Sequence, residues 1–179
     1  MMREIELRRS IRKYKSKPVE MSIINSLIDS ARLAPSGSNT QPWHFIIITD
    51  DQIKNEVATV SHNQKWMLTA PVFIVCVADI ASRIPDSENM ELDETTSSFE
   101  LKQIIRDTSI AIEHIVLNAI TFDLGTCWVA WFTQKEIRPI LGIPNNKYVV
   151  SILTLGYPDE NPNPRKRKEL KEIIHINKW

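Results

Sequence analysis

The sequence has few glycines, and it lacks the short motifs that identify several common classes of enzyme. Its four glycines form neither a GxGxxG pattern nor a Walker loop, which argues against a Rossmann nucleotide site or a kinase-type site. No GxSxG sequence marks a hydrolase nucleophile. The four histidines show no HExxH or CxxH spacing, so we expect no metal site.

Cysteine and long apolar runs are also scarce. Cys76 and Cys127 lie in apolar runs and form no CxxC pair, so we expect buried free thiols in a reducing compartment. The start of the chain, residues 1–6, has no apolar signal-peptide core. The longest apolar run, residues 70–78, is far too short to span a membrane. These absences predict a cytoplasmic protein with no membrane partner.

The formal net charge is zero, from 22 basic and 22 acidic residues. A nucleic-acid-binding domain normally has a basic excess, so we expect no nucleic-acid partner. The charges are nevertheless unevenly distributed along the chain. Residues 8–17 contain six Arg or Lys and no acid, residues 165–168 read Arg-Lys-Arg-Lys, and residues 86–100 contain six acids and no base.

Apolar periodicity predicts one α+β domain over residues 1–179, because that length suits a single domain with a full core. Ile24, Leu27, Ile28 and Ala31, for example, have the spacing of an amphipathic helix. Helices and strands alternate irregularly, which indicates a mixed central sheet flanked by helices. The expected helices cover residues 3–8, 21–34, 51–59, 64–69, 99–122 and 134–141, and the expected strands cover residues 43–49, 72–78, 126–132 and 148–155.

Three further features shape the expected domain. From Ile110 onward the helix over 99–122 is apolar on more than one face, which an internal helix with a dimer contact would explain. Gly125 fits the C-terminal cap of that helix. Residues 80–97 are polar and acidic, and we expect a loop or lid there. Prolines then force an extended C-terminal arm, at Pro158, Pro162 and Pro164.

Arg8, Arg9, Ser10 and Arg12 have the chemistry of a phosphate site. A phosphate monoester carries close to two negative charges and three acceptor oxygens, which arginine forks match with paired hydrogen bonds and a serine hydroxyl supplements. Each charge-assisted bond contributes about 1.5–3 kcal/mol. Composition alone fits a solvated basic face or a nucleic-acid patch equally well. The second basic run, residues 165–168, would complete a clamp from a distant segment.

Two other segments combine turn residues with polar groups. Residues 34–43 read Ala-Pro-Ser-Gly-Ser-Asn-Thr-Gln-Pro-Trp, and their Asn and Gln amides suit a ring edge that carries both donors and acceptors. The same residues also suit a plain turn between a helix and a strand. Residues 124–128, Leu-Gly-Thr-Cys-Trp, form a helix-to-strand turn whose backbone N–H groups could approach a ligand or only cap the helix.

The order of these motifs resembles the nitroreductase superfamily of FMN proteins. Arg-Arg-Ser-Ile-Arg-Lys-Tyr comes first, then the segment 34–43, then Leu-Gly-Thr-Cys-Trp, then Gly-Tyr-Pro and Arg-Lys-Arg. The resemblance covers nearly the whole chain. It implies a three-layer α+β fold and an obligate homodimer with two FMN sites at the dimer interface.

The resemblance also implies a role for individual residues. It assigns the FMN phosphate and ribityl chain to Arg8, Arg9, Ser10 and Arg12. Five residues of the partner subunit would complete each site: Pro35, Ser36, Gly37, Asn39 and Gln41. Residues expected along the isoalloxazine ring are Asn63, Thr126, Cys127, Trp128 and Val129. Two residues of the C-terminal arm would bind the phosphate, namely Arg165 and Arg167.

The implied activity is an NAD(P)H-dependent reductase that works by a ping-pong mechanism on a small electron-poor acceptor, such as a nitroaromatic or a quinone. NADH or NADPH would reduce the flavin at N5, so no side chain need act as a catalytic group. Alternatives are other flavin reactions of relatives, namely reductive dehalogenation, flavin breakdown or azoline oxidation, and a non-enzymatic nucleic-acid-binding protein. One departure is Trp131, which follows Ala130 and either narrows the pocket or faces the core.

Overall fold

Five α-helices and four strands form the framework of the computed structural model, which describes residues 1 to 179. The helices are α1 (Arg3–Leu7), α2 (Met21–Arg32), α3 (Asp51–Val60), α4 (Phe99–Thr121) and α5 (Gln134–Leu141). The strands are β1 (Trp43–Ile48), β2 (Val72–Asp79), β3 (Gly125–Val129) and β4 (Lys147–Gly156). Short 3₁₀ turns cover Gly37–Asn39, Lys65–Thr69, Ile80–Ser82 and Leu170–Glu172. The expected helix over 64–69 is therefore one of these turns.

The four strands form one sheet in the order β1-β2-β4-β3, and every pair of neighbours is antiparallel. The α+β class is confirmed, but the expected mixed sheet is wrong. The only parallel pairing is an isolated bridge between Ser10 and Thr126. The physical reason is the place of β4. Strands β2 and β3, which α4 connects, do run in the same direction, but β4 lies between them.

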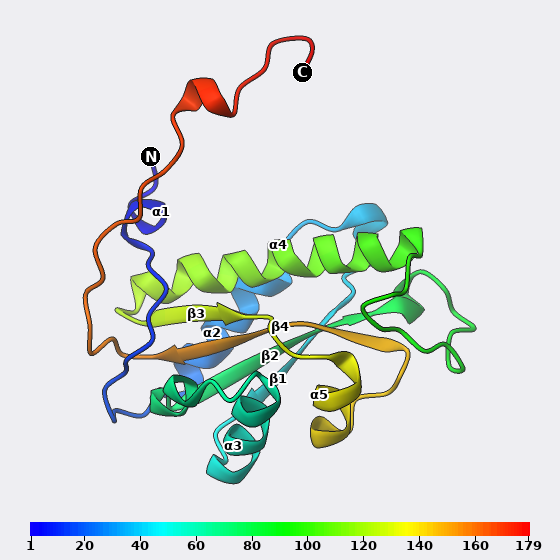
Figure 1. Cartoon of the computed structure of the whole chain (residues 1–179), viewed down its shortest axis with the longest axis horizontal. Helices are drawn as coiled ribbons and strands as arrows, with labels where there is room; N and C mark the ends of the chain where they lie inside the picture. The colour runs from blue at the N-terminus through cyan, green and yellow to red at the C-terminus, as the bar shows by residue number, and fades with distance from the viewer.

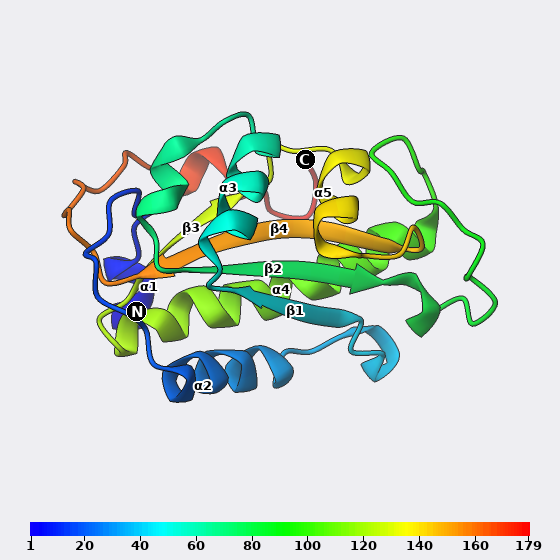
Figure 2. The same ribbon diagram turned by 90° about the horizontal axis from the view of Figure 1, so that it is seen from below.

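Helices cover both faces of the sheet, which gives the expected three layers (Figures 1 and 2). One core of 23 buried residues packs α2 and α4 against one face, and another of 16 residues packs α3 and α5 against the other. Successive residues of β2 alternate between the two cores, with Ile74 in the first and Val75 in the second. Strand β2 is therefore buried on both faces, as its continuous apolar run predicts.

Helix α4 is the longest element and begins at a side-chain cap. The hydroxyl of Ser98 accepts a hydrogen bond from the N–H of Leu101 at 3.0 Å, which satisfies one of the free donors of the first turn. Nine of its 23 residues are buried, whereas Phe99, Lys102, Arg106 and Ile110 follow one another along an exposed face. In the single chain α4 is therefore not the internal helix that its apolar pattern predicts, because it buries one face and leaves apolar side chains such as Phe99 and Ile110 on the other. No helix in the chain is both long and apolar enough to cross a membrane.

Gly125 does not cap α4, contrary to expectation. The left-handed residue after the helix is Asp123, with φ 56°, while Gly125 is the first residue of β3. A Cβ at position 125 would lie 2.5 Å from Cγ1 of Ile11 and 3.0 Å from Cγ of Pro158. Glycine is needed here because the N-terminal segment and the start of the arm both pack closely against the backbone.

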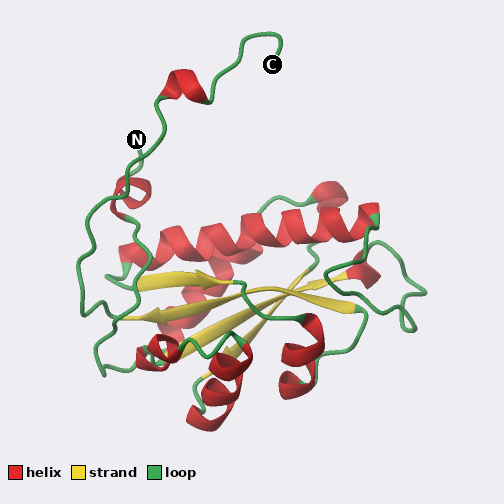
Figure 3. Cartoon of the chain, viewed as in Figure 1, coloured by secondary structure: helices red, strands yellow, loops and turns green.

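The C-terminal arm leaves the body after β4 and extends away from it, on the side where the N-terminus lies (Figures 1 and 3). Almost every residue from 159 onward is exposed. The expected extended arm is thus present, and it carries exposed apolar side chains at Leu170, Ile173, Ile174, Ile176 and Trp179.

Candidate functional site

The first basic run is fixed along the outer edge of β3. The N–H of Ile11 donates to the carbonyl of Thr126 at 3.0 Å, next to the Ser10–Thr126 bridge. The side chain of Ile11 is buried, and so is Tyr14, whose hydroxyl donates to the Ile11 carbonyl at 2.7 Å. Because these two side chains point inward, the intervening Arg12 is left on the outside, where it is exposed.

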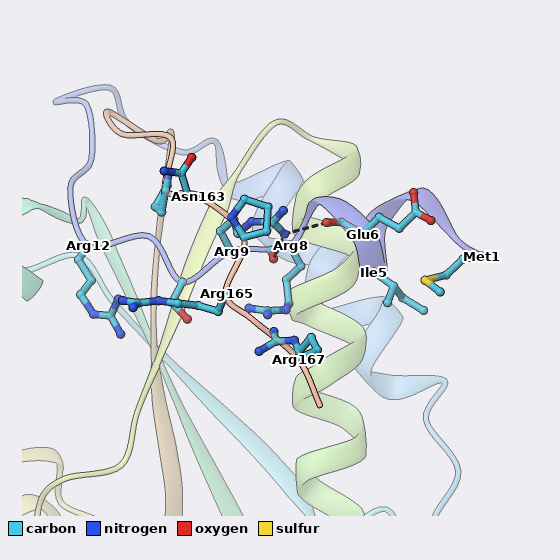
Figure 4. A pocket seen from close by; sticks show the side chains of 12 residues that line it. Met1, Ile5, Glu6, Arg8, Arg9, Arg12, Asn163, Arg165 and Arg167 are labelled. Atoms are coloured by element: carbon cyan, nitrogen blue, oxygen red, sulfur yellow. Dashed lines mark hydrogen bonds between the residues drawn. The ribbon is translucent and has the colours of Figure 1, made fainter. Parts of the chain in front are cut away.

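Both basic runs line one cavity of about 660 Å³ (Figure 4). The first run contributes Arg8, Arg9, Ser10 and Arg12. The arm contributes Pro162, Asn163, Pro164, Arg165 and Arg167, and α1 adds Met1, Ile5 and Glu6 from its own neighbourhood. In Figure 4 the side chains of Arg165 and Arg167 reach from the arm toward those of the first run. The fold therefore brings together two segments that lie about 150 residues apart in the sequence.

The arginines of this cavity form no ion pair within the chain, although one acid, Glu6, also lines the cavity. None of Arg8, Arg9, Arg12, Arg165 and Arg167 forms an ion pair with a carboxylate of the chain. Arg9 donates only to carbonyls, those of Glu6 at 2.7 Å and Arg8 at 2.8 Å. Five like charges around a hollow repel one another until an anion occupies it. The donor set fits a phosphate group, whose oxygens take paired hydrogen bonds from arginine.

Contacts that the sequence does not reveal hold the arm beside the first run. Lys13 and Asp159 form an ion pair at 2.8 Å, and the N–H of Asp159 donates to the Lys13 carbonyl at 2.9 Å. The hydrogen bond from Lys13 also holds the pKa of Asp159 below its usual value. Next along the arm, the carboxylate of Glu160 accepts from the backbone N–H of Arg12. No local motif marks Asp159 or Glu160, so the sequence does not indicate their role.

The turn after α2 lies apart from the cavity within one chain. Its residues Pro35, Ser36, Gly37, Asn39 and Gln41 do not line the cavity. Gly37 contacts Asp107 in the middle of α4, whereas the basic run lies beside Thr126, beyond the end of that helix. The rise of an α-helix puts about 20 Å between Asp107 and Thr121. In Figures 1 and 2 the turn and the N-terminal segment lie toward opposite ends of α4.

The predicted ring contacts are only partly accessible. Within β3, Thr126, Cys127 and Val129 are buried and Trp128 is exposed. Burial raises the pKa of the Cys127 thiol, against smaller opposing effects of Arg12 and Ser10, so this thiol stays protonated near neutral pH. Asn63 is exposed and has a left-handed backbone, with φ 52°.

Trp131 does not face the core. Its ring is 64% exposed and stacks on His62 with 3.9 Å between ring centroids. The backbone carbonyl of Trp131 also lies 3.0 Å from Nδ1 of His62. This stack joins the loop of Asn63 to the end of β3, so it connects two segments that carry predicted ring contacts.

Known proteins match this arrangement over most of its length. Residues 5–157 match the sequence model of the Nitroreductase family. A nitroreductase family protein of Clostridium novyi NT is 32% identical, with a TM-score of 0.74 over 98% of this chain and 92% of that one. The NADPH:FMN oxidoreductase of Vibrio harveyi, solved in complex with NAD+, is 26% identical, with a TM-score of 0.86 over 98% and 76% of the two chains. The FMN reductase (NAD(P)H) of Bacillus subtilis is 24% identical over 93% of this chain and 69% of its own length. The chain therefore belongs to the nitroreductase family.

Proposed function

We propose that the protein is an FMN-dependent oxidoreductase that uses NADH or NADPH to reduce small electron-poor acceptors, such as nitroaromatics or quinones, by a ping-pong mechanism. The observation that carries this proposal is the cavity lined by five arginines that form no ion pair within the chain. Membership of the nitroreductase family supports it, as do relatives that are named for FMN and NAD(P)H.

The chain's own residues bind and orient the cofactor. Arg8, Arg9 and Arg12 would hold the phosphate from one side, with Arg165 and Arg167 from the other. Tyr14 keeps the first run in place by bonding the Ile11 carbonyl. When bound, FMN supplies the redox chemistry, taking electrons from the nicotinamide and giving them to the acceptor. No nucleophilic side chain is required for that chemistry.

We also propose that the functional unit is a homodimer with FMN at the interface. In one chain the turn of residues 35–41 lies beside the middle of α4, about 20 Å along that helix from the end near which the basic run lies. The turn of a second chain would therefore complete the site. The exposed strip of α4, which includes Ile110, and the exposed apolar side chains of the arm provide surface for such a contact. We expect the dimer to be cytoplasmic.

The direct test is spectroscopic. Purified protein should be yellow, NADH or NADPH should bleach it without oxygen, and a nitroaromatic or quinone should restore the colour. A colourless protein that gains no thermal stability from added FMN would contradict the proposal.

The phosphate clamp has its own readout in the same preparation. Arg8→Ala with Arg12→Ala should weaken FMN binding about 100-fold or more, because each lost charge-assisted bond contributes about 1.5–3 kcal/mol. Riboflavin, which has no phosphate, should bind this variant and the wild type alike. Lys135→Ala removes an exposed cation of α5 outside the cavity and serves as the control. Equal loss of FMN and riboflavin would argue against a phosphate clamp.

A further inference from the structure

A nearly buried ion pair holds the turn of residues 35–41 on the body of the protein. Asp107, in the middle of α4, accepts a hydrogen bond from the N–H of Gly37 at 3.1 Å. Nη2 of Arg83 donates to the Gly37 carbonyl at 3.0 Å and lies 3.3 Å from the same oxygen of Asp107. The Arg83 and Asp107 side chains are only 14% and 11% exposed. The two charged groups thus hold both backbone polar groups of Gly37.

The ion pair lies where a side chain at position 37 would be. A Cβ at position 37 would lie 2.5 Å from Nη2 of Arg83 and 3.7 Å from Oδ2 of Asp107. The backbone of Gly37 itself does not lie in the left-handed region. A side chain at position 37 would therefore push the Arg83 guanidinium out of its place beside Asp107.

The residues that follow Gly37 do have an unfavourable backbone. Ser38, Asn39 and Gln41 have φ angles of 55°, 56° and 47°, in the left-handed region that side chains other than glycine seldom adopt. Asn39 and Gln41 are exposed. A conformation of this kind persists where the surrounding structure enforces it, and such conformations concentrate at functional sites. Within the turn, the hydroxyl of Ser36 accepts from the N–H of Gln41 at 3.0 Å. The ion pair at Gly37 fixes the turn to the body of the protein.

The same ion pair also fixes the start of the polar, acidic segment of residues 80–97, because Arg83 belongs to that segment. Arg83 is followed by residues 84–98, which lead into α4 without a helix or strand. Further along, the carbonyl of Leu92 accepts from Nη1 of Arg138 at 2.7 Å, and Arg138 is buried. The acidic segment is therefore anchored at Arg83 and at Leu92, and the first anchor is shared with the turn.

We propose that Arg83 and Asp107 are positioning residues for the flavin ring. They hold Gly37 so that the exposed amides of Asn39 and Gln41 are presented, in a fixed geometry, to the flavin bound by the other chain. This inference rests on the proposed function, because it needs FMN at the dimer interface. It adds that ring binding depends on two charged residues that themselves lie behind the turn and carry no cofactor contact.

Flavin titration of Asp107→Asn and Arg83→Met tests the proposal. Both variants should bind FMN about 10-fold more weakly than wild type, and the double variant should be no weaker than the weaker single one. Riboflavin affinity should fall by the same factor, because the turn would contact the ring and not the phosphate. Visible circular dichroism of the bound flavin should change as well. Asp29→Asn, which breaks the exposed pair with Arg32 on α2, is the matched control and should change nothing.

A milder variant keeps the test decisive if Arg83→Met or Asp107→Asn destabilises the fold. Arg83→Lys retains the positive charge beside Asp107 but lacks the planar guanidinium, so it should keep the wild-type unfolding midpoint and lose about 3-fold in flavin affinity. Wild-type flavin affinity and an unchanged dichroism spectrum in all folded variants would overturn the inference. A wild-type protein that binds no FMN would instead overturn the proposed function.

Discussion

Two buried side chains of the first basic run, Ile11 and Tyr14, leave its arginines on the outside, where they line the cavity. Ile11 and Tyr14 are each 5% exposed, and they anchor a segment whose arginines point outward. The Tyr14 hydroxyl donates to the Ile11 carbonyl at 2.7 Å and lies 2.7 Å from Oγ1 of Thr154 on β4. Burial raises the pKa of Tyr14, so the hydroxyl remains a donor at any physiological pH. A neutral buried phenol thus supports a charged site.

Tyr14→Phe should therefore lower the free energy of unfolding by about 1–3 kcal/mol, because it leaves the Ile11 carbonyl and the Thr154 hydroxyl without this partner. It should also weaken FMN binding, since the arginine run loses an anchor. Urea unfolding and FMN titration measure the two effects. Tyr157→Phe provides the comparison. The Tyr157 ring lies 3.8 Å from Nζ of Lys17 in a cation–π contact that Phe would keep, and its hydroxyl has no hydrogen bond. Equal effects of the two substitutions would show that Tyr14 has no special role.

For individual residues, the sequence predicts the side chains that would bind a ligand better than it predicts the residues that hold those side chains in place. The arginines of the cavity could be named because a phosphate requires their kind of side chain. Asp159 and Glu160 could not, because their partners Lys13 and Arg12 are brought near only by the folded arm. Arg83 and Asp107 were missed for the same reason, since neither belongs to a local motif. Gly37 could be selected from the sequence, but the ion pair that holds its backbone could not.

The periodicity of apolar residues predicts the bounds of the strands but not their order in the sheet. The bounds of the helices and strands follow closely from apolar spacing, caps and prolines. The order of the strands does not, because β4 is inserted between β2 and β3 by contacts between distant segments. The register also carries an irregularity between Cys76 and Val77, where β2 pairs with β4. No local residue pattern indicates this irregularity.

Asp79 joins the end of β2 to the start of β4 through Lys147. Burial alone would raise the pKa of Asp79, but hydrogen bonds from Lys147 and the N–H of Ala81, and the charges of Lys147 and His44, lower it overall. Since its folded-state pKa is below the unfolded value, Asp79 contributes stability above about pH 4. That contribution is lost as the pH falls through the lowered pKa.

Asp79→Asn should accordingly lower the free energy of unfolding at pH 7 by about 1.5–3 kcal/mol, the range for a hydrogen bond to a charged group. The difference from wild type should shrink as the pH falls below 4. Urea unfolding at pH 7, 5 and 3 checks both statements. Asp86→Asn, in the exposed acidic segment, should unfold like wild type. A difference between Asp79→Asn and wild type that stays constant with pH would contradict this assignment.

The whole molecule carries its proposed binding groups at two separate places. The arginine cavity lies where the N-terminal segment meets the arm, and the turn of residues 35–41 lies beside the middle of α4 (Figures 1 and 4). Neither place alone encloses a flavin. A dimer that pairs the cavity of one chain with the turn of the other would complete two equivalent sites.

Complementation between two defective chains tests this central claim most directly. One chain carries Arg8→Ala and Arg12→Ala. The other carries Asn39→Gly and Gln41→Gly, which remove the amides and still allow the left-handed backbone. Each homodimer should bind FMN weakly, whereas the isolated heterodimer has one intact cavity facing one intact turn. Titration of that heterodimer should show one FMN bound per dimer with wild-type affinity. A heterodimer that binds FMN no better than the two homodimers would contradict a site shared between chains.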